Sequence, residues 1–348
     1  MNIPELEAFL AELNEPKYRA AQIFTWMHRG VTIDGMTNLS KKLRETLSER
    51  AEVFFPKVEQ KLVSKLDGTV KYLFALSDGN VIESVFMRYK HGNTICISSE
   101  VGCPMGCRFC ASTIGGLVRK LAPSELLGQV IAAQNDMGER ISNIVMMGIG
   151  EPLDNYDNVV KFLSLVGDPN GINIGSRHIS LSTCGLVDKI DALAKLDLQI
   201  TLSISLHAAD DETRSSIMPV NNRWNIAALL DACRRYFDAT GRRISFEYTL
   251  IAGKNDSPAY AKRLASTLKH GLYRGSNHFP IHVNLIPVNE VAETGFVRSG
   301  SDAVAKFADI LEKEGINATV RRKLGSDINA SCGQLRRAKI NAESGENL

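Results

Sequence analysis

Apolar positions change their period along the chain, and each change marks a different kind of element. In the first 50 residues they recur every three or four positions, as in Leu6, Phe9 and Leu13, which predicts helices. From about residue 60 to 98 the pattern is that of short strands, in the runs VKYLFAL, VIESVFM and NTICIS, which are separated by turns at DG, DGN and HGN.

Beyond this point, strand-like and helical stretches alternate. The strand-like runs lie at about 142–147, 177–182, 199–206, 244–251, 280–286 and 317–321. The helical patterns lie between them, near 123–137, 157–166, 187–195, 225–239, 257–269 and 301–314. Regular exchange of this kind indicates βαβ units and a parallel sheet. We therefore expect an α/β fold built on a partial (β/α)6 barrel, with an open doubly wound sheet as the alternative; no GxGxxG motif supports a nicotinamide-binding domain.

The same patterns divide the chain into four parts. We expect an N-terminal helical module over 1–55, a small β extension over 56–92, the partial barrel over 93–325 and a C-terminal segment over 326–348.

Composition narrows the class of protein but does not indicate a function. The chain has 348 residues, of which 44% are hydrophobic and 23% charged, as in ordinary globular proteins. It has no apolar run of the roughly 18 residues that a membrane span needs, and its acidic N-terminus lacks the order of a signal peptide. We expect a cytoplasmic protein without a membrane partner.

The net charge of +2 means that any nucleic-acid surface must be local. Candidate basic clusters are Lys41, Lys42, Arg44 and Arg50; Arg321, Arg322 and Lys323; and Arg336, Arg337 and Lys339. Each could equally be a solvated face.

Cysteine carries the first chemical signal. The chain has seven cysteines, and the odd number argues against a disulfide framework. Three of them form the pattern Cys103-x3-Cys107-x2-Cys110 within GCPMGCRFCAST. Thiolates are the ligands of iron–sulfur clusters, and a set of three leaves one iron open to a substrate. A zinc site with a distant fourth ligand and buried structural cysteines are the alternatives.

The cysteine loop follows the strand NTICIS, and other strand ends carry polar residues next to glycine or proline. These residues are Gly148, Gly150, Glu151 and Pro152; Ser182, Thr183, Cys184 and Gly185; Ser205, Leu206 and His207; and Pro287, Val288 and Asn289. Each group alone is explained by a turn, a helix cap or a structural histidine. Because barrel enzymes build their sites at the carboxyl ends of strands, we interpret the groups together as one pocket.

At this point the residues resemble a known family. The chain is similar to the RlmN and Cfr family of radical S-adenosylmethionine (SAM) methyltransferases, which methylate one adenine of 23S ribosomal RNA. The matching segments are KYRAAQIFTWMHRG, CISSEVGCPMGCRFCAST, VMMGIGEPLDNYDNV, SLSTCGLV, SISLHA, VNLIPVN and GSDINASCGQLR. The CGQLR segment and the upstream cysteine distinguish this family from other radical SAM enzymes.

The resemblance implies the site and its cofactors. A [4Fe-4S] cluster would be held by Cys103, Cys107 and Cys110, and SAM would be contacted by Gly150, Glu151, Ser182, Ser205, Leu206, His207 and Asn289. Cys332 matches the cysteine that is methylated and passes its carbon to the RNA. Cys96 matches the thiol that resolves the covalent intermediate, and Glu83 matches the position assigned as proton acceptor. Without the resemblance, a cysteine such as Cys96 in an alternating strand is more often simply packed.

The resemblance also implies substrates and partners. The RlmN activity is methylation of carbon 2 of adenine 2503 in 23S rRNA and of adenine 37 in certain tRNAs, whereas Cfr methylates carbon 8 and confers antibiotic resistance. Ser326 and Ser331, beside Cys332, depart from the commonest form of the motif, although other segments resemble RlmN. We expect a monomer with a one-electron donor such as a flavodoxin or a ferredoxin.

The N-terminal module mixes basic and aromatic residues in a way suited to RNA loops. These residues are Lys17, Tyr18, Arg19, Gln22, Trp26, His28 and Arg29. More distant alternatives are a radical SAM enzyme acting on a small molecule or peptide, and a zinc-containing RNA-binding protein.

Overall fold

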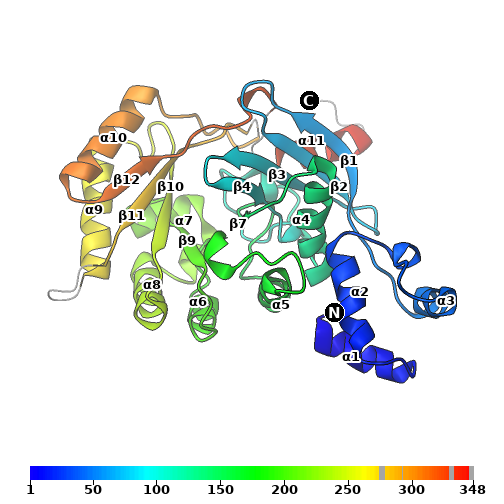
Figure 1. Ribbon diagram of the computed structural model, residues 1–348. Helices are drawn as coiled ribbons and strands as arrows, with labels where there is room; N and C mark the ends of the chain where they lie inside the picture. Colours follow the sequence, from blue (N-terminus) through cyan, green and yellow to red (C-terminus); the bar gives the residue numbers. More distant parts are fainter. Residues whose placement is uncertain (274–278, 292, 329–332, 345–348) are drawn as a thin grey trace.

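The strands of the chain form one long twisted sheet, with helices in a row along one side of it (Figure 1). The computed structural model describes residues 1–273, 279–291, 293–328 and 333–344. In spatial order the sheet contains β1 (Lys57–Val63), β2 (Val70–Ala75), β3 (Val81–Tyr89), β4 (Gly92–Cys96), β7 (Asn143–Met146), β8 (Ile179–Thr183), β9 (Thr201–Ser205), β10 (Ile244–Leu250), β11 (His282–Pro287) and β12 (Asn317–Val320). The first four strands pair antiparallel, and from β4 to β12 every pair is parallel.

Helices connect the parallel strands, as the sequence predicts. They are α4 (Pro123–Met137), α5 (Tyr156–Gly167), α6 (Val187–Ala194), α8 (Ile226–Thr240), α9 (Pro258–Leu272) and α10 (Ser301–Lys313), with the short α7 (Asp211–Ile217) before α8. Among the described strands, β1 and β12 are the two edges of the sheet. The α/β fold with its partial (β/α)6 core is therefore confirmed.

The remaining elements lie at the ends of the chain and around the cysteine loop. The N-terminal module consists of α1 (Ile3–Glu12), α2 (Tyr18–His28) and α3 (Lys41–Arg50). The last described element is α11 (Gln334–Ser344), which lies near β1 and β3 (Figure 1). A separate hairpin of β5 (Glu100–Gly102) and β6 (Leu117–Lys120) brackets the cysteine loop. Short 3-10 turns occur at Ile33–Gly35, Ala111–Thr113, Ser176–His178, Pro219–Asn222 and Ser326–Ile328.

Local sequence explains where the helices begin. Asn2 and Glu5 form a capping box at the start of α1, and the side chains of Asn225 and Ser257 cap α8 and α9. None of the helices within the described ranges is long and apolar enough to cross a membrane.

Alternation along the strands produces a polar inner face. In β10, Phe246, Tyr248 and Leu250 are buried in the main core, whereas Glu247 and Thr249 line the cavity described below. A parallel strand buried on both faces usually carries apolar side chains on each. Buried polar side chains on one face therefore indicate a functional surface.

The β extension continues the sheet of the core. Val85 on β3 pairs with Cys96 on β4, and Cys96 pairs with Val145 on β7. The division of the chain at residue 92 stays a prediction.

Candidate active site

A cavity of about 340 Å3 opens where the parallel strands end. Its walls include the three cysteines of the loop and residues from successive strand ends. Among the predicted site residues it is lined by Cys96, Cys103, Cys107, Cys110, Gly150, Glu151, Ser182, Ser205, His207 and Asn289. The predicted pocket therefore exists among the described residues, although Leu206 is buried behind its wall.

The cysteine loop is closed by its own main chain. The Cys103 N–H donates to the Gly116 carbonyl at 3.1 Å, and the Thr113 hydroxyl donates to the Cys110 carbonyl at 2.9 Å. Gly102 has a φ of +82°, and a Cβ there would lie 2.0 Å from the Gly116 oxygen. Only glycine allows the two ends of the loop to approach so closely.

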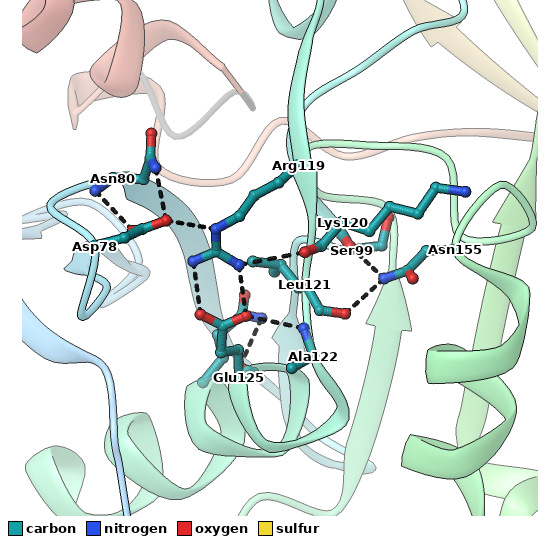
Figure 2. Close-up of polar contacts among 10 residues, drawn as sticks. Asp78, Asn80, Ser99, Arg119, Lys120, Leu121, Ala122, Glu125 and Asn155 are labelled. Atoms are coloured by element: carbon teal, nitrogen blue, oxygen red, sulfur yellow. Dashed lines mark hydrogen bonds and ion pairs between the residues drawn. The ribbon is translucent and has the colours of Figure 1, made fainter.

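A charged network fixes the hairpin that carries the loop (Figure 2). Arg119 on β6 donates both terminal nitrogens to Glu125 at 2.8 Å and its Nε to Asp78 in the turn between β2 and β3. Glu125 also accepts the Ala122 N–H and thereby caps α4. These contacts hold the pKa of Asp78 well below its usual range, chiefly through the Arg119 hydrogen bond. One guanidinium thus connects the loop to a helix and to the β extension.

The donor set fits an iron–sulfur cluster, whose usual ligands are cysteine thiolates. Cys103 and Cys107 are buried and Cys110 is half-buried. Among the described residues, which include all three, no group of three donors is gathered closely enough to hold one metal ion. Zinc would require its sulfurs about 2.3 Å from a common centre, whereas each thiolate of a cluster binds a different iron. Burial raises the pKa of the Cys107 thiol to about 12, so cluster binding would displace protons.

The loop after β7 brings Glu151 to the cavity wall, where it contacts the buried Glu100 of β5. The Glu151 side chain accepts the Cys184 N–H at 2.7 Å and the Leu153 N–H at 3.0 Å, and the Glu151 N–H donates to Glu100 at 2.8 Å. Burial raises the pKa of Glu151, and it raises the pKa of Glu100 to about 8. Gly150 has a φ of +105°, and a Cβ there would lie 2.6 Å from that of Glu100. The strand end therefore requires glycine at 150.

The ends of β8 and β9 present hydroxyls and a neutral imidazole. The hydroxyl oxygens of Ser182 and Ser205 lie 3.4 Å apart. His207 accepts the Thr249 N–H on Nδ1 at 3.0 Å, so its proton is on Nε2. Burial lowers the pKa of His207 to about 3, and the ring is therefore neutral.

Arg214 on α7 was missed by the sequence analysis. Its side chain is fully buried and donates to the carbonyls of Cys184 at 2.6 Å, Leu206 at 3.1 Å and Ser205 at 3.3 Å. It also donates to the Asn221 side chain at 2.9 Å. One buried cation thus holds the ends of β8 and β9 together, and an arginine inside a polar stretch gave no signal of this role.

Glu247 on β10 was missed as well. It lines the cavity, and it accepts hydrogen bonds from Asn284 at 2.7 Å and from Ser245 at 3.2 Å. The available signal was a lone acid within the apolar strand run FEYTL.

Comparison with known proteins identifies this architecture. Residues 97–263 match the model of the radical SAM superfamily, and residues 1–53 match the ribosomal RNA large subunit methyltransferase N-terminal domain. A probable dual-specificity RNA methyltransferase RlmN from Alkaliphilus oremlandii is 52% identical over 341 residues, which cover 98% of this chain and 97% of that protein. The chain belongs to the RlmN family of RNA methyltransferases.

Further relatives agree in length and fold. The Clostridium tetani protein, also named as a probable RlmN, is 50% identical over 99% of this chain and 97% of its own length. The crystal structure of a radical SAM methyltransferase from Sphaerobacter thermophilus is 44% identical and superimposes with a TM-score of 0.90 over 96% of this chain and 97% of that one. As an RlmN family member, the chain is a SAM-dependent RNA methyltransferase, and its cofactors are a [4Fe-4S] cluster and SAM.

The three predicted catalytic residues, Glu83, Cys96 and Cys332, differ in how the structure describes them. Cys96 lines the cavity on β4, buried with Val85 and Met87 of β3. Glu83 is buried on β3 and contacts the main chain of the C-terminal segment. Cys332 lies outside the described residues, but the next residue, Gly333, is described and would place a Cβ 3.0 Å from the Ser112 nitrogen in the cysteine loop.

The predicted basic clusters of this RlmN relative differ in their surroundings. Arg321, Arg322 and Lys323 are exposed and line the mouth of the cavity together with the exposed Arg298. In the C-terminal cluster, by contrast, Arg336 is buried, and Arg337 and Lys339 form ion pairs with Glu293 and Glu59. The cysteines without a family role also differ, because Cys184 lines the cavity whereas Cys233 is buried in the core, as expected.

Proposed function

We propose that the chain methylates carbon 2 of adenine 2503 in 23S rRNA and carbon 2 of adenine 37 in certain tRNAs, with Cys332 as the carrier of the methyl group. The observation that supports this most directly is the convergence of three groups on one cavity. These groups are the cluster cysteines, the strand-end residues proposed to contact SAM, and Cys96. The name of the relatives, dual-specificity RNA methyltransferase, supports the two RNA substrates.

In this proposal the cysteine loop binds the cluster and the strand ends bind SAM. Cys103, Cys107 and Cys110 would hold the [4Fe-4S] cluster through their thiolates, which would leave one iron available to SAM. Once bound, the cluster would supply the electron for reductive cleavage of SAM to a 5′-deoxyadenosyl radical. Gly150, Glu151, Ser182, Ser205, Leu206, His207 and Asn289 orient SAM, with the neutral His207 offering its Nε2–H as a donor.

Thiol chemistry explains why two cysteines outside the cluster are needed. Carbon 2 of adenine is not nucleophilic, so a direct polar displacement on the SAM methyl is unavailable. The Cys332 thiolate instead takes the methyl from one SAM, as ordinary thiolates do. The 5′-deoxyadenosyl radical would take a hydrogen atom from that methyl, and the resulting carbon radical would add to carbon 2 of the ring. The adduct would lose the carbon 2 proton and return one electron to the cluster. The Cys96 thiolate would then attack the Cys332 sulfur, so that the S–S bond forms as the carbon–sulfur bond breaks, and a proton would complete the new methyl group. The products are methylated RNA and a Cys96–Cys332 disulfide that must be reduced before the next turnover.

Charge at the cavity mouth supports RNA as the substrate. Arg298, Arg321, Arg322 and Lys323 form an exposed rim, which is suited to phosphate contacts. The target base must leave its stack to reach a buried reaction centre. In the N-terminal module, Tyr18 is exposed and the Arg19 guanidinium lies over its ring at 5.5 Å, a pairing of aromatic and basic side chains that suits RNA.

The catalytic disulfide suggests the cellular compartment in which the enzyme works. A disulfide that is reduced in every cycle fits the reducing cytoplasm. We propose a cytoplasmic monomer that receives electrons from a flavodoxin or a ferredoxin.

Two cysteine variants test the proposed function. Cys332→Ala is expected to abolish RNA methylation while SAM is still cleaved reductively to 5′-deoxyadenosine; retained methylation would refute the carrier role. Cys96→Ala is expected to accumulate a covalent protein–RNA adduct, visible as a shifted band on a denaturing gel. Free methylated RNA from Cys96→Ala, without adduct, would contradict the resolving role. Cys233→Ala is the matched control, since that thiol is buried in the core.

A further inference from the structure

The C-terminal segment is tied to β3 directly after the position of Cys332. The Glu83 carboxylate accepts the Gly333 N–H at 2.8 Å through Oε2 and the Arg336 N–H at 2.6 Å through Oε1. These N–H groups lie at the start of α11, where main-chain donors have no partner within the helix. Glu83 therefore caps the helix that follows Cys332.

Lys71 on β2 completes this contact. Its ammonium lies 3.1 Å from Glu83 Oε2, and both side chains are only 1% exposed. Lys71 pairs with Val85 across the strands and Glu83 pairs with Leu73, so the two charged residues are diagonal neighbours on one face of the sheet. The ion pair offsets part of the cost of burying either charged side chain alone.

The segment is tied a second time before Cys332. The Gly325 N–H donates to Asp67 at 2.9 Å, and the Asp327 carboxylate accepts the Ser64 hydroxyl at 2.7 Å and the Lys65 N–H at 2.8 Å. Ser64, Lys65 and Asp67 lie in the turn between β1 and β2, in the same β extension as Lys71 and Glu83. The two sets of contacts flank Cys332 in sequence.

We propose that the β1–β3 extension is a clamp that holds residues 325–328 and 333–336, which flank Cys332 in sequence, with Lys71 and Glu83 as positioning residues at its buried end. This inference rests on the proposed role of Cys332 as methyl carrier. Gly333 has a φ of +82° and packs against Ser112, two residues after Cys110, so the clamped segment is also fixed against the cysteine loop. The clamp thereby joins the residues that follow Cys332 in sequence to the cysteine loop.

This role differs from that of a proton acceptor for the adenine, which the family resemblance implies for Glu83. Both carboxylate oxygens already accept main-chain N–H groups, and Glu83 is not among the described residues that line the cavity. A proton acceptor must come within hydrogen-bond reach of the atom that loses the proton. The two roles predict different stalled species, so they can be separated by experiment.

Amide hydrogen exchange tests the clamp without any activity. Full-length protein, purified anaerobically with its cluster and without SAM, is compared with Glu83→Gln, Lys71→Met and Asp327→Ala. We expect exchange in peptides covering 325–340 to rise by about tenfold or more in each variant, since each removes an anchor of local structure. Glu59→Gln is the matched control, because it removes only the half-exposed ion pair to Lys339 on the same helix. Unchanged exchange in Asp327→Ala and Glu83→Gln would overturn the clamp.

The second test is the ratio of methylated RNA to 5′-deoxyadenosine, the two products that follow from SAM cleavage. In the clamp variants, 5′-deoxyadenosine should still form, but methylated RNA per 5′-deoxyadenosine should fall by about tenfold, because the carrier is no longer held in reach of the radical. Asp327→Ala should show this uncoupling as Glu83→Gln does, although it cannot affect a proton acceptor at 83. Accumulation of a protein–RNA adduct in Glu83→Gln, with normal exchange, would instead assign proton transfer to Glu83 and refute the clamp. If Cys332→Ala retained methylation, the proposed function would fail while the exchange result would still stand.

Discussion

At the scale of single residues, Arg214 shows how a buried charge can hold two strand ends of the cavity in place, although it does not line the cavity itself. Its guanidinium holds the carbonyls at the ends of β8 and β9. Arg214→Leu would leave these acceptors unpaired, and we expect the free energy of unfolding to fall by about 3 kcal/mol. Urea denaturation measures this change. Arg263→Leu, which removes an exposed ion pair to Asp210, should lower the free energy of unfolding far less than Arg214→Leu; equal losses in the two variants would contradict this role of Arg214.

The cluster cysteines give a sharper outcome. Alanine at Cys103, Cys107 or Cys110 should remove the absorbance near 400 nm of anaerobically purified protein and its bound iron, since each thiolate holds one iron. Cys233→Ala should keep both, because Cys233 is a core residue. One zinc and no iron in the wild-type protein would refute the cluster.

His28 links burial to pH. Burial in the contact between α2 and the loop at Ile172 lowers its pKa from 6.5 to about 4. The unfolded chain therefore binds a proton more readily between pH 6.5 and 4, and stability falls as the pH falls through this range. His28→Asn keeps an acceptor for the Ile172 N–H. In this variant the free energy of unfolding should fall less on acidification, by up to about 3 kcal/mol, because the titrating imidazole is gone. Urea unfolding of both proteins at pH 7 and pH 4.5 measures this difference. The same pH dependence in wild type and His28→Asn would show that His28 is not responsible.

At the scale of elements, hydrophobic period was a good guide to the core. The expected helix at 123–137 matches α4 residue for residue, and β4 and the strands from β7 to β12 lie close to the strand-like runs of the sequence. The hairpin of β5 and β6 was missed because its strands have only three and four residues and pair around the cysteine loop. The short α7 was missed because seven mainly polar residues show no clear period.

The charged network on β6 has a testable consequence for the cysteine loop. Arg119→Gln removes the link to Asp78 and Glu125, so the loop should hold its cluster less firmly. We expect the rate of iron loss to a chelator to rise several-fold. Arg88→Gln, which breaks an exposed ion pair to Glu139 away from the loop, is the control. Equal rates in wild type and Arg119→Gln would show that the network does not support the loop.

At the scale of the whole molecule, the site is assembled from residues far apart in the sequence. Motif spacing could identify the cysteine loop and the strand ends, because each lies within a few residues. It could not show that Glu83 contacts Gly333, 250 positions away, since no local pattern encodes a contact of that range. The family models match residues 1–53 and 97–263, whereas the extension and the C-terminal segment of the proposed clamp lie outside both matches.

The basic rim predicts the salt dependence of RNA binding. Arg322→Glu combined with Lys323→Glu should weaken binding of a 23S rRNA fragment and reduce the slope of log affinity against log salt by about 0.7 per lost phosphate contact. Lys313→Glu, at the end of α10, should leave the slope unchanged. Filter binding over a range of salt concentrations measures both; equal slopes in all three proteins would exclude the rim from the RNA interface.

The most direct test of the central claim is mass spectrometry of nucleosides from 23S rRNA after incubation with the reduced enzyme and methyl-labelled SAM. The account predicts 2-methyladenosine at adenine 2503 that carries the label, and none from Cys332→Ala. Labelled 8-methyladenosine at that position, or labelled 2-methyladenosine from Cys332→Ala, would contradict it.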